Sequence, residues 1–326
     1  MTVANNPWSP PPDLGNRKLL VVAYTDHYFG GHFGQNLTFP DQWELDLSIE
    51  FSYDISRTAE ADAIWFHAPS IRNLPKKIEG QKWIIMSMES AANYPFLRDK
   101  KIMSLFDIQM TYRLDSDVPV PYCKTQLYND FLDLPVLSFV EKREVPLLFV
   151  ASNPVKQRDT YAKELSRYIP IDCPGKCLNN QSIDGFSDPS VYNISRLQNL
   201  IGQYKFYLCL ENSNCTDYVT EKLYMPLAAG TVPVYQGANN VTDLIPQKDS
   251  IICTKDFASP KLLANYLLYL SNNATAYQQI LNWKNMACTD LFKRLVEVAS
   301  IEPLLRMFIK LAHGCEYSCT CGGRLR

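Results

Sequence analysis

Short apolar runs alternate along the chain with longer stretches that are polar or amphipathic. The runs typical of buried strands are residues 18–24, 61–67, 82–88, 145–150, 205–210, 231–235 and 250–253. Helical spacing of apolar positions predicts helices over residues 159–168, 220–229 and 261–270, and one or two more within 291–311. Strands that alternate with helices in this way predict an α/β fold with mostly parallel sheets.

The elements form two series, separated by the charged run Glu141-Lys142-Arg143-Glu144. We therefore expect Rossmann-like domains at residues 17–142 and 143–290, facing each other across a cleft at the carboxyl ends of their strands. The Pro-rich residues 1–16 predict an extended lead-in, and residues 291–326 predict helices and a Cys-rich tail. A chain of 326 residues suits two domains of ordinary size.

Composition and charge exclude several classes of function. The chain has 46% hydrophobic and 20% charged residues, and its formal charge is -2. It has no basic field or basic cluster for a nucleic acid backbone. There is also no P-loop and no Gly-x-Ser-x-Gly motif, so neither an NTPase nor a serine hydrolase has positive support.

The cysteines and glycosylation sequons favour an oxidising, lumenal compartment. Ten cysteines are present, and six Asn-x-Ser/Thr sequons begin at Asn36, Asn180, Asn193, Asn214, Asn240 and Asn273. Disulfides are the expected state of the cysteines in such a compartment. A zinc site at Cys315, Cys319 and Cys321 is the alternative, but no second Cys/His pair has finger spacing.

Targeting segments are not apparent in this sequence. The longest apolar run near the start, residues 19–24, is far shorter than the roughly 20 residues of a membrane span. Residues 1–16 lack the apolar region of a signal peptide. If the protein is lumenal, we expect this chain to be a catalytic fragment or an incomplete part of a longer, membrane-anchored protein.

The most informative segment is residues 207–223, in which an apolar strand, a polar loop and a helix start surround Glu221 and Lys222. Residues 229–237 continue as a second buried strand closed by glycine, which completes a βαβ unit. The sequences Glu-Asn (211–212), Asp-Tyr-Val-Thr-Glu-Lys (217–222) and Ala-Gly-Thr-Val-Pro-Val (229–234) resemble the donor-binding signature of the α1,3/4-fucosyltransferase family. Segments 61–67, 87–90, 111–122 and 150–154 follow in the order that this family shows.

This resemblance implies a GT-B fold and an inverting α1,3-fucosyltransferase. Its donor would be GDP-fucose, and its acceptor a GlcNAc hydroxyl of a glycoprotein glycan, either the N-glycan core or a LacNAc/Lewis-type unit. Residues 88–94 and the Cys319-Thr320-Cys321 tail lean toward the plant-type core enzymes. The resemblance further implies no required cofactor, no nucleic acid partner, and a Golgi lumen location through an anchor absent from this chain.

Glu89 follows an apolar strand, at the carboxyl end where α/β sheets expose functional groups. Its resemblance to the Glu-Ser position of the family implies that it is the general base. Arg158 and Lys222 are the candidates that hold the diphosphate, since both supply the positive charge that a departing phosphate needs. Lys156 lies two positions from Arg158 and is its alternative.

The resemblance assigns Glu221 to the donor ribose, and Asn212 and Tyr218 to the lining of the donor site. Neighbouring residues of a helix do not face each other, so we expect Glu221 and Lys222 to have separate roles.

Two alternatives remain open. Asp115-Ser116-Asp117 looks like the Asp-x-Asp metal motif of other glycosyltransferases, and hard oxygen ligands suit Mg²⁺ or Mn²⁺. The triplet also resembles the fucosyltransferases' own segment, so no metal site is expected. The second alternative is a catalytically inactive glycan-binding protein with the same fold, which would not need both a base and leaving-group cations.

Overall fold

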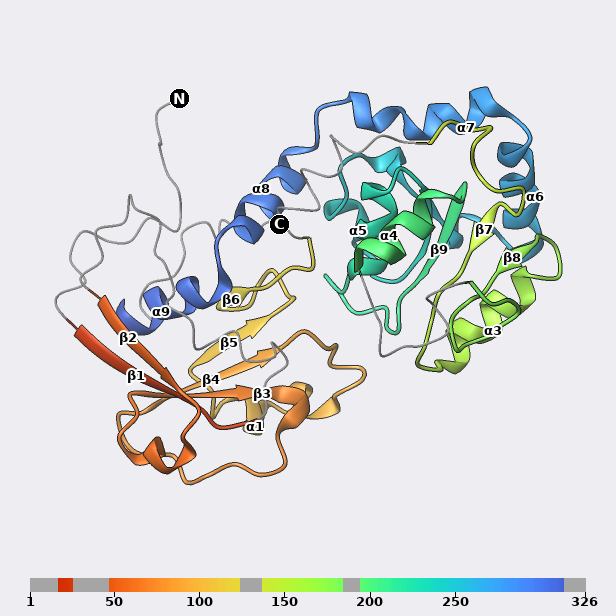
Figure 1. Cartoon of the computed structure of the whole chain (residues 1–326). Coiled ribbons are helices and arrows are strands. Elements are labelled where there is room, and N and C mark those ends of the chain that lie inside the picture. Colours follow the sequence, from red (N-terminus) through yellow and green to blue (C-terminus); the bar gives the residue numbers. More distant parts are fainter. Residues whose placement is uncertain (1–16, 26–46, 124–136, 184–193, 314–326) are drawn as a thin grey trace. The chain divides into compact units, whose positions relative to one another are not determined.

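The computed structural model describes residues 17–25, 47–123, 137–183 and 194–313, and they form an α/β protein with two parallel sheets (Figure 1). Unit 1 combines the residues up to Pro121 with those from Val298 onward, and unit 2 contains Tyr122–Glu297. The extended lead-in, the cysteines at 315, 319 and 321, and the sequons at Asn36 and Asn193 lie outside the described residues.

The sheet of unit 1 has six parallel strands in the order β2-β1-β3-β4-β5-β6. They are β1 (Arg17–Ala23), β2 (Leu47–Ser52), β3 (Ala63–His67), β4 (Lys82–Ser87), β5 (Ile108–Thr111) and β6 (Val118–Pro119). Both faces of the central strands are buried, so these strands read as continuous apolar runs rather than as alternating ones.

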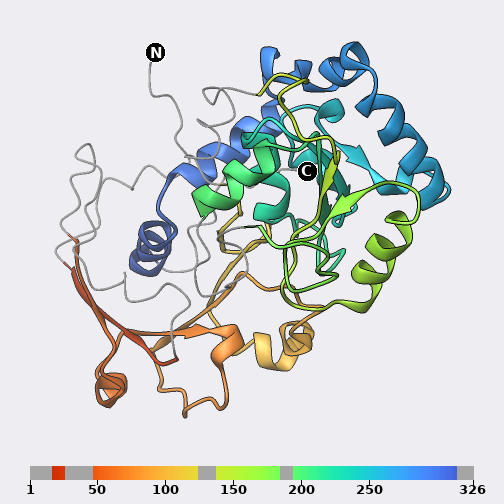
Figure 2. The ribbon, with the colours of Figure 1, turned by 45° about the vertical axis from the view of Figure 1, so that its right-hand side comes forward.

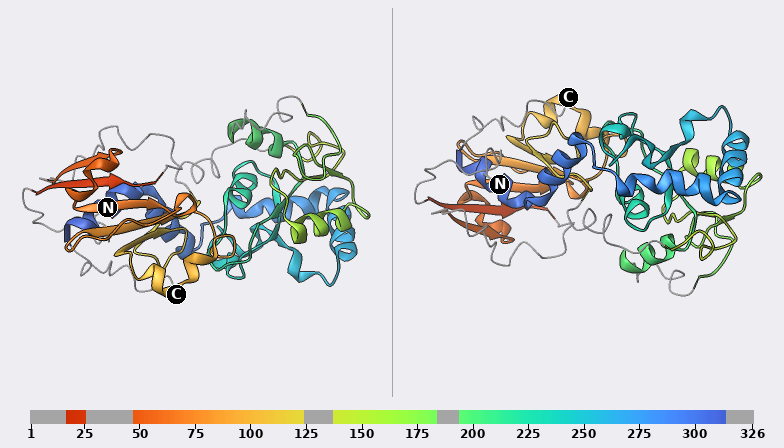
Figure 3. Two further views of the ribbon diagram at one scale, coloured as in Figure 1. Left: turned by 90° about the horizontal axis from the view of Figure 1, so that it is seen from below. Right: turned by 90° about the horizontal axis from the view of Figure 1, so that it is seen from above.

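Helix α9 (Pro303–His313) covers one face of this sheet, as Figure 3 shows. Met307 and Phe308 pack there against alternate strand residues such as Trp65 and Met86. The other face packs against α1 (Lys100–Met103) and the side chain of Phe106. The last described helix therefore completes the core of the first unit, a grouping that the order of elements along the chain did not indicate.

The sheet of unit 2 has five parallel strands in the order β11-β10-β9-β7-β8. They are β7 (Leu147–Leu148), β8 (Ile171–Asp172), β9 (Phe206–Leu210), β10 (Val232–Gln236) and β11 (Ile252–Cys253). The helices of the chain from here on are α3 (Lys156–Leu165), α4 (Ile194–Gly202), α5 (Glu221–Ala228), α6 (Pro260–Ser271), α7 (Ala274–Leu281) and α8 (Asp290–Ser300). Short 3-10 helices are η2 (Ile55–Ala59), η3 (Ala68–Ser70), η4 (Pro95–Arg98), η6 (Val241–Asp243), η7 (Lys248–Ser250), η8 (Thr254–Asp256) and η9 (Asn282–Asn285).

Helices lie on both faces of this second sheet (Figure 2). Helix α3 lies beside α6, and both contribute to a core that contains Phe206, Leu208 and Leu210 of β9. Helix α4 lies beside α5, and α5 packs on β9 and β10. The α/β class and two Rossmann-like units, as predicted, are confirmed.

The strand order places a topological switch point between β7 and β9. Chain connections leave these two neighbouring strands in opposite directions across the sheet, to β8 on one side and to β10 on the other. In open α/β sheets, ligands bind beyond the carboxyl ends of the strands at such a point. The residues that follow β7 and β9 are therefore the first place to look for a site in unit 2.

Lys142 holds the segment that precedes β7 against the second sheet. Its buried ammonium donates hydrogen bonds to the carbonyls of Gly202 at 2.8 Å, Tyr204 at 3.1 Å and Gly230 at 3.3 Å. These contacts attach the 141–144 segment to the second sheet, so the domain boundary predicted at 142/143 lies inside unit 2.

We expect Lys142→Met to lower the free energy of unfolding by about 2 kcal/mol, because buried carbonyls lose their donor. Burial, with the charges of Lys205 and Lys284, also lowers the pKa of Lys142 to about 8. Between about pH 8 and 10.5 the unfolded chain therefore binds more protons, and this lysine makes stability rise with pH. The variant should lose that rise, measured by urea unfolding at pH 7, 8.5 and 10. The same change at the exposed Lys163 on α3 is the control, and equal effects of the two would contradict the prediction.

Candidate functional site

The carboxyl end of β9 and the start of α5 form the core of the site. Thr220 is the N-cap of α5, and its hydroxyl accepts a hydrogen bond from the backbone N–H of Lys222 at 3.4 Å. Helix α5 therefore begins with capped amides and with the positive end of its dipole directed at the residues that follow β9. This is a common arrangement for binding an anion.

A buried carboxylate lies beneath this helix start. Glu211 comes directly after β9, and its Oε1 accepts hydrogen bonds from the Thr220 backbone N–H at 2.7 Å and from its hydroxyl at 3.0 Å. The second oxygen, Oε2, lies 2.8 Å from the Thr220 hydroxyl and 3.7 Å from Lys222 Nζ. The side chain of Glu211 is 0% exposed. Sequence reasoning gave Glu211 no role, although it stands beside Asn212 in the Glu-Asn signature.

Lys222 lies between two carboxylates, those of Glu211 and Glu221. Its Nζ is 3.0 Å from Oε1 of Glu221 and 3.1 Å from the Thr220 hydroxyl, in addition to the Glu211 contact. Glu221 and Lys222 contact each other through their side chains, and the separate roles expected for them stay a prediction. Adjacent backbone positions diverge, but both long side chains reach the same point above the first turn of α5.

Electrostatics keep Lys222 charged. Burial lowers the pKa of the Lys222 ammonium, but the carboxylates of Glu211 and Glu221 outweigh burial and hold this pKa above its ordinary value. Burial raises the pKa of Glu211, opposed by Lys222 and by the hydrogen bonds of Thr220. A buried carboxylate costs several kcal/mol in lost hydration, and each partner offsets part of that cost.

Arg158 supplies the second cation. It lies in the first turn of α3, after β7, and its side chain is 6% exposed. Nε donates to Asp159 at 3.0 Å and Nη2 donates to the Asn153 carbonyl, while the guanidinium stacks 5.8 Å from the centre of the Phe149 ring. These contacts fix the guanidinium and leave Nη1 for a ligand. Lys156 is exposed, so burial favours Arg158 over its sequence alternative.

The two predicted cations come together at the switch point of unit 2. Arg158 follows β7 and Lys222 follows β9, which are neighbouring strands. The positive charge of Arg158 acts on Lys222 and is among the influences that lower its pKa, after burial. Cations so placed can bind an anionic ligand of high charge, such as a diphosphate.

Several buried polar atoms beside these cations have unmet hydrogen-bonding capacity. Among the described residues, Oδ1 of Asn212, Oγ of Ser213 and Oε1 of Gln236 have no partner. The Glu211 backbone N–H donates to the Gln236 carbonyl at 2.9 Å, so these atoms gather at the ends of β9 and β10. Buried polar atoms without a partner are rare in proteins, so these three atoms are candidates to hydrogen-bond a ligand.

Two hydrogen bonds between Asp217 and Asn240 hold the loop between β9 and α5. Asp217 has a positive φ of 64°, which is unusual for a residue with a side chain. Asn240 donates to Asp217 Oδ1 at 2.7 Å and accepts from the Asp217 backbone N–H at 3.0 Å. The neighbouring Tyr218 is buried, with its ring edge-on to Tyr122 at 6.2 Å. Tyr218 is thus held within unit 2 by packing.

Glu89 belongs to unit 1. It follows β4 and is half-buried, and its Oε2 accepts a hydrogen bond from the Asn93 amide at 3.3 Å. Its backbone is held by Ser87, whose hydroxyl accepts from the Glu89 N–H at 3.2 Å and donates to the Glu89 carbonyl at 2.9 Å. The carboxyl end of a parallel strand is thus the observed position of Glu89, as the sequence pattern predicted.

The Asp115-Ser116-Asp117 carboxylates bind other protein groups. Asp115 forms an ion pair with Arg113, and Asp117 with Lys310 of α9 at 3.0 Å. Within the described part of the chain, no three His, Cys, Asp or Glu side chains are grouped as they would be around a metal.

Two comparisons of sequence identify the family. Residues 17–123 match "Fucosyltransferase, N-terminal", and residues 140–310 match "Glycosyltransferase family 10 (fucosyltransferase) C-term". The chain belongs to glycosyltransferase family 10, the fucosyltransferases. Of the curated relatives, "GDP-fucose protein O-fucosyltransferase 3" of Xenopus laevis is 37% identical over 220 residues, covering 65% of this chain and 47% of its own length. The Homo sapiens protein of the same name is 33% identical over 223 residues, with 65% and 46% covered.

Solved structures show the same fold. The chain matches "Crystal Structure of alpha1,3-Fucosyltransferase with GDP" with a TM-score of 0.61 at 16% identity, covering 94% of this chain and 92% of that one. The predicted GT-B class and the prediction of a glycosyltransferase of the fucosyltransferase family are confirmed. The leaning toward plant-type core enzymes finds no support, because the relatives carry the protein O-fucosyltransferase name. The chain spans about half the length of these family 10 relatives.

The cysteines of this family 10 chain differ from the disulfide expectation. Cys123, Cys173, Cys177, Cys209, Cys215 and Cys253 are free thiols in the structure. Cys173 and Cys177 lie four positions apart and are both buried, and Cys177 Sγ is instead 3.8 Å from Nη2 of Arg158.

Helices long and apolar enough to cross a bilayer are absent from the described ranges.

Proposed function

We propose that the chain transfers fucose from GDP-fucose to a hydroxyl of a protein acceptor. The observation that carries this proposal is the pair of cations, Arg158 and Lys222, at the switch point of unit 2, where Lys222 is buried between carboxylates that keep it charged. Family membership supplies the donor, and the relatives named GDP-fucose protein O-fucosyltransferase 3 suggest the acceptor class.

The proposed reaction is an inverting displacement. Glu89 removes the proton from the acceptor hydroxyl, whose oxygen attacks the anomeric carbon of fucose while the bond to the β-phosphate oxygen breaks. Arg158 and Lys222 then neutralise the charge that develops on the departing GDP. Glu221 is 40% exposed beside Lys222, a position that suits hydrogen bonds to the donor ribose. Asn212 and Tyr218 complete the donor site.

The GlcNAc acceptor is the second candidate. The resemblance of the sequence to the α1,3/4-fucosyltransferases supports α1,3 transfer to GlcNAc of a glycoprotein glycan, whether the N-glycan core or a LacNAc unit. Both acceptors present a hydroxyl to the same base, so the donor half of the reaction is common to them. Their difference lies in the groups around that hydroxyl.

A transfer assay with matched acceptors separates the two. Folded secreted protein domains with and without N-glycans, and free GlcNAc-terminated glycans, would be incubated with GDP-fucose, and the products mapped by mass spectrometry. We expect fucose on Ser or Thr of the protein, including the domains without N-glycans. Fucose found only on GlcNAc would support the second candidate, and GDP-fucose left unused with every acceptor would overturn both.

We expect transfer to survive EDTA, because two protein cations supply the charge that a metal would otherwise carry. The assay compares initial rates after dialysis against EDTA with rates after Mn²⁺ or Mg²⁺ is restored. Rates that agree within about twofold are expected, since no metal would then stabilise the transition-state charge. Complete loss that Mn²⁺ reverses would contradict this account and return attention to Asp115 and Asp117.

We also propose a Golgi lumen location, supported by the abundance of sequons. Four of them lie in the described residues, at Asn180, Asn214, Asn240 and Asn273, and Asn214 is exposed. Expression of the protein in cultured animal cells, followed by glycosidase treatment and imaging, tests this proposal. An unglycosylated, cytosolic product would overturn it.

A further inference from the structure

Glu211 is the most deeply buried charged group at the site, and the reaction above gives it no part. Its side chain is 0% exposed, so it has no contact with solvent. Its contacts instead run to the cap of α5 and to the underside of the lysine. A group in this place can act only through its neighbours.

The hydroxyl of Thr220 connects the carboxylate to the lysine. It donates to Glu211, 2.8 Å away, and accepts from Lys222 Nζ at 3.1 Å and from the Lys222 backbone N–H at 3.4 Å. Oε2 of Glu211 also attracts Nζ directly across 3.7 Å. The backbone N–H and the side chain of Lys222 are therefore both positioned by the same pair of residues.

The side chain of Glu211 is tightly enclosed. The Glu211 backbone N–H donates to the Gln236 carbonyl. Gly237 has no side chain, and this leaves space for the side chain of Glu211. A Cβ at Gly237 would come within 2.7 Å of Glu211 Cγ and 2.3 Å of the Tyr235 hydroxyl. The Tyr235 hydroxyl in turn accepts a hydrogen bond from the Ala238 backbone N–H at 2.9 Å. Glu211 is thus held by burial and by its hydrogen bonds to Thr220, at 3.7 Å from the ammonium of Lys222.

We propose that Glu211 is a positioning residue that, together with the Thr220 hydroxyl, holds Lys222 Nζ where the diphosphate of the donor needs it. The inference rests on the proposed use of GDP-fucose. Its ligand is a nucleoside diphosphate sugar, and its chemical contribution is orientation of one ammonium. Glu211 itself exchanges no proton with the substrate.

Two opposing effects shape the expected phenotype of Glu211→Gln. Removing the negative charge favours an incoming phosphate, whereas the amide group of glutamine turns a donor toward the ammonium and displaces it. A displacement of about 1 Å can cost roughly 100-fold in rate. We expect kcat/KM for GDP-fucose to fall about 10- to 100-fold, with GDP affinity changed by less than about threefold.

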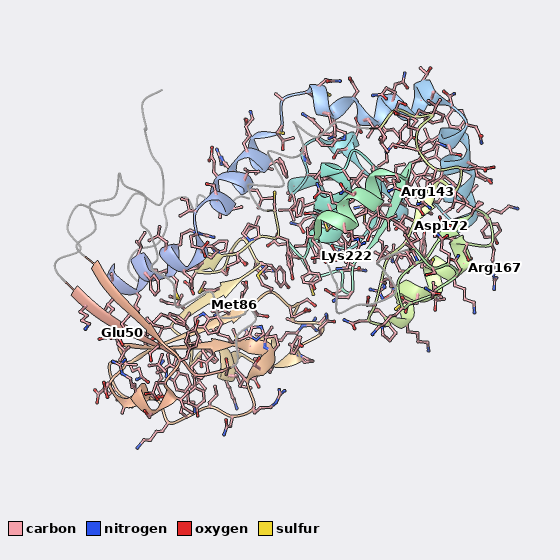
Figure 4. The ribbon with its side chains drawn as sticks, in the orientation of Figure 1. Glu50, Met86, Arg143, Arg167, Asp172 and Lys222 are labelled. Atoms are coloured by element: carbon pink, nitrogen blue, oxygen red, sulfur yellow. The ribbon has the colours of Figure 1, made fainter. Side chains whose placement is uncertain are left out.

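A double-mutant cycle tests whether Glu211 acts through Lys222. In the Lys222→Ala background, Glu211→Gln should change kcat/KM by less than about threefold, because the group that it positions is already gone. Thr220→Val, which keeps the shape but removes the hydroxyl, should behave like Glu211→Gln in both backgrounds. Asp172→Asn is the matched control, since this carboxylate binds the Tyr204 hydroxyl and lies apart from Lys222 in Figure 4. Its effect should be the same in both backgrounds.

The pH dependence of kcat/KM distinguishes positioning of Lys222 from a purely structural role of Glu211, because a structural role would leave this pH dependence unchanged. Glu211 and Glu221 raise the pKa of Lys222, so Glu211→Gln lowers that pKa and shifts the alkaline limb of kcat/KM to lower pH. Additive losses in the cycle, or an unmoved alkaline limb, would overturn the proposal. Loss of the cooperative unfolding transition in both Glu211→Gln and Thr220→Val would also overturn it, since Glu211 would then serve folding.

These outcomes are separable from failure of the proposed function. A wild-type protein that binds no GDP in calorimetry and consumes no GDP-fucose would show that the proposed function is wrong. A wild-type protein that does both, with additive losses in the cycle, would overturn the role of Glu211 alone.

Discussion

Glu89→Gln is expected to lower turnover by roughly two to four orders of magnitude while GDP binding stays unchanged, the range that a positioned general base supplies. The amide keeps the size of the side chain and its contact with Asn93, but it cannot accept the acceptor proton. Glu89 follows β4 of unit 1, whereas the cations for the diphosphate lie in unit 2. The loss should therefore appear in kcat with little change in GDP affinity.

The measurement is steady-state kinetics with the acceptor found in the transfer assay, beside calorimetric titration with GDP. Glu79→Gln is the matched control, because Glu79 is exposed and lies before β4, at the opposite end of the strand from Glu89. We expect wild-type turnover from the control. Turnover of Glu89→Gln within about threefold of wild type would place the base elsewhere, at Asp115 or Asp117.

Lys222→Ala is expected to damage use of the donor far more than use of the acceptor. Loss of a charge-assisted contact to phosphate costs about 1.5 to 3 kcal/mol, which corresponds to about 10- to 100-fold. The variant also leaves Glu211 buried without its cation, so the carboxylate gains a proton more readily. Lys222→Arg should rescue only in part, because the guanidinium is larger and Glu211, Thr220 and Glu221 are arranged around an ammonium.

Calorimetry with GDP and kinetics for both substrates distinguish the outcomes for Lys222. Lys261→Ala, on the exposed side of α6, removes the same charge from unit 2 and should leave all parameters unchanged. Unchanged GDP affinity together with a shifted acceptor KM would show that Lys222 does not hold the diphosphate. A glycan-binding protein without turnover, the alternative left by the sequence, would show no effect of either Glu89→Gln or Lys222→Ala on glycan affinity.

The sequence by itself determined the α/β class and most of the elements around the site. The continuous apolar runs at β3, β4, β9 and β10 were readable because strands buried on both faces hold few polar residues. Strands β6 and β8 have two residues each and were not predicted, because no apolar run marks them. Strands β7 and β11 are equally short, but they lie within the predicted apolar runs 145–150 and 250–253.

Part of the candidate site could also be predicted from the sequence. Arg158, Asn212, Tyr218, Glu221 and Lys222 stand in sequence signatures that a resemblance makes visible, and Glu89 follows a strand. Glu211 stands in the same signature, yet nothing local shows that its side chain turns beneath α5. That direction depends on the pairing of β9 with β10 and on the space that Gly237 leaves.

Only the tertiary structure decided which residues share a unit and a contact. Asp217 and Asn240 are 23 positions apart, and Lys310 binds Asp117 across 193 positions. Long-range contacts of this kind depend on how strands are ordered within a sheet, which hydrophobic period does not specify. The sequence therefore determined most of the elements and the chemistry carried by each. The order of strands in the second sheet, β8-β7-β9 above all, decided that Arg158 and Lys222 lie at the same edge.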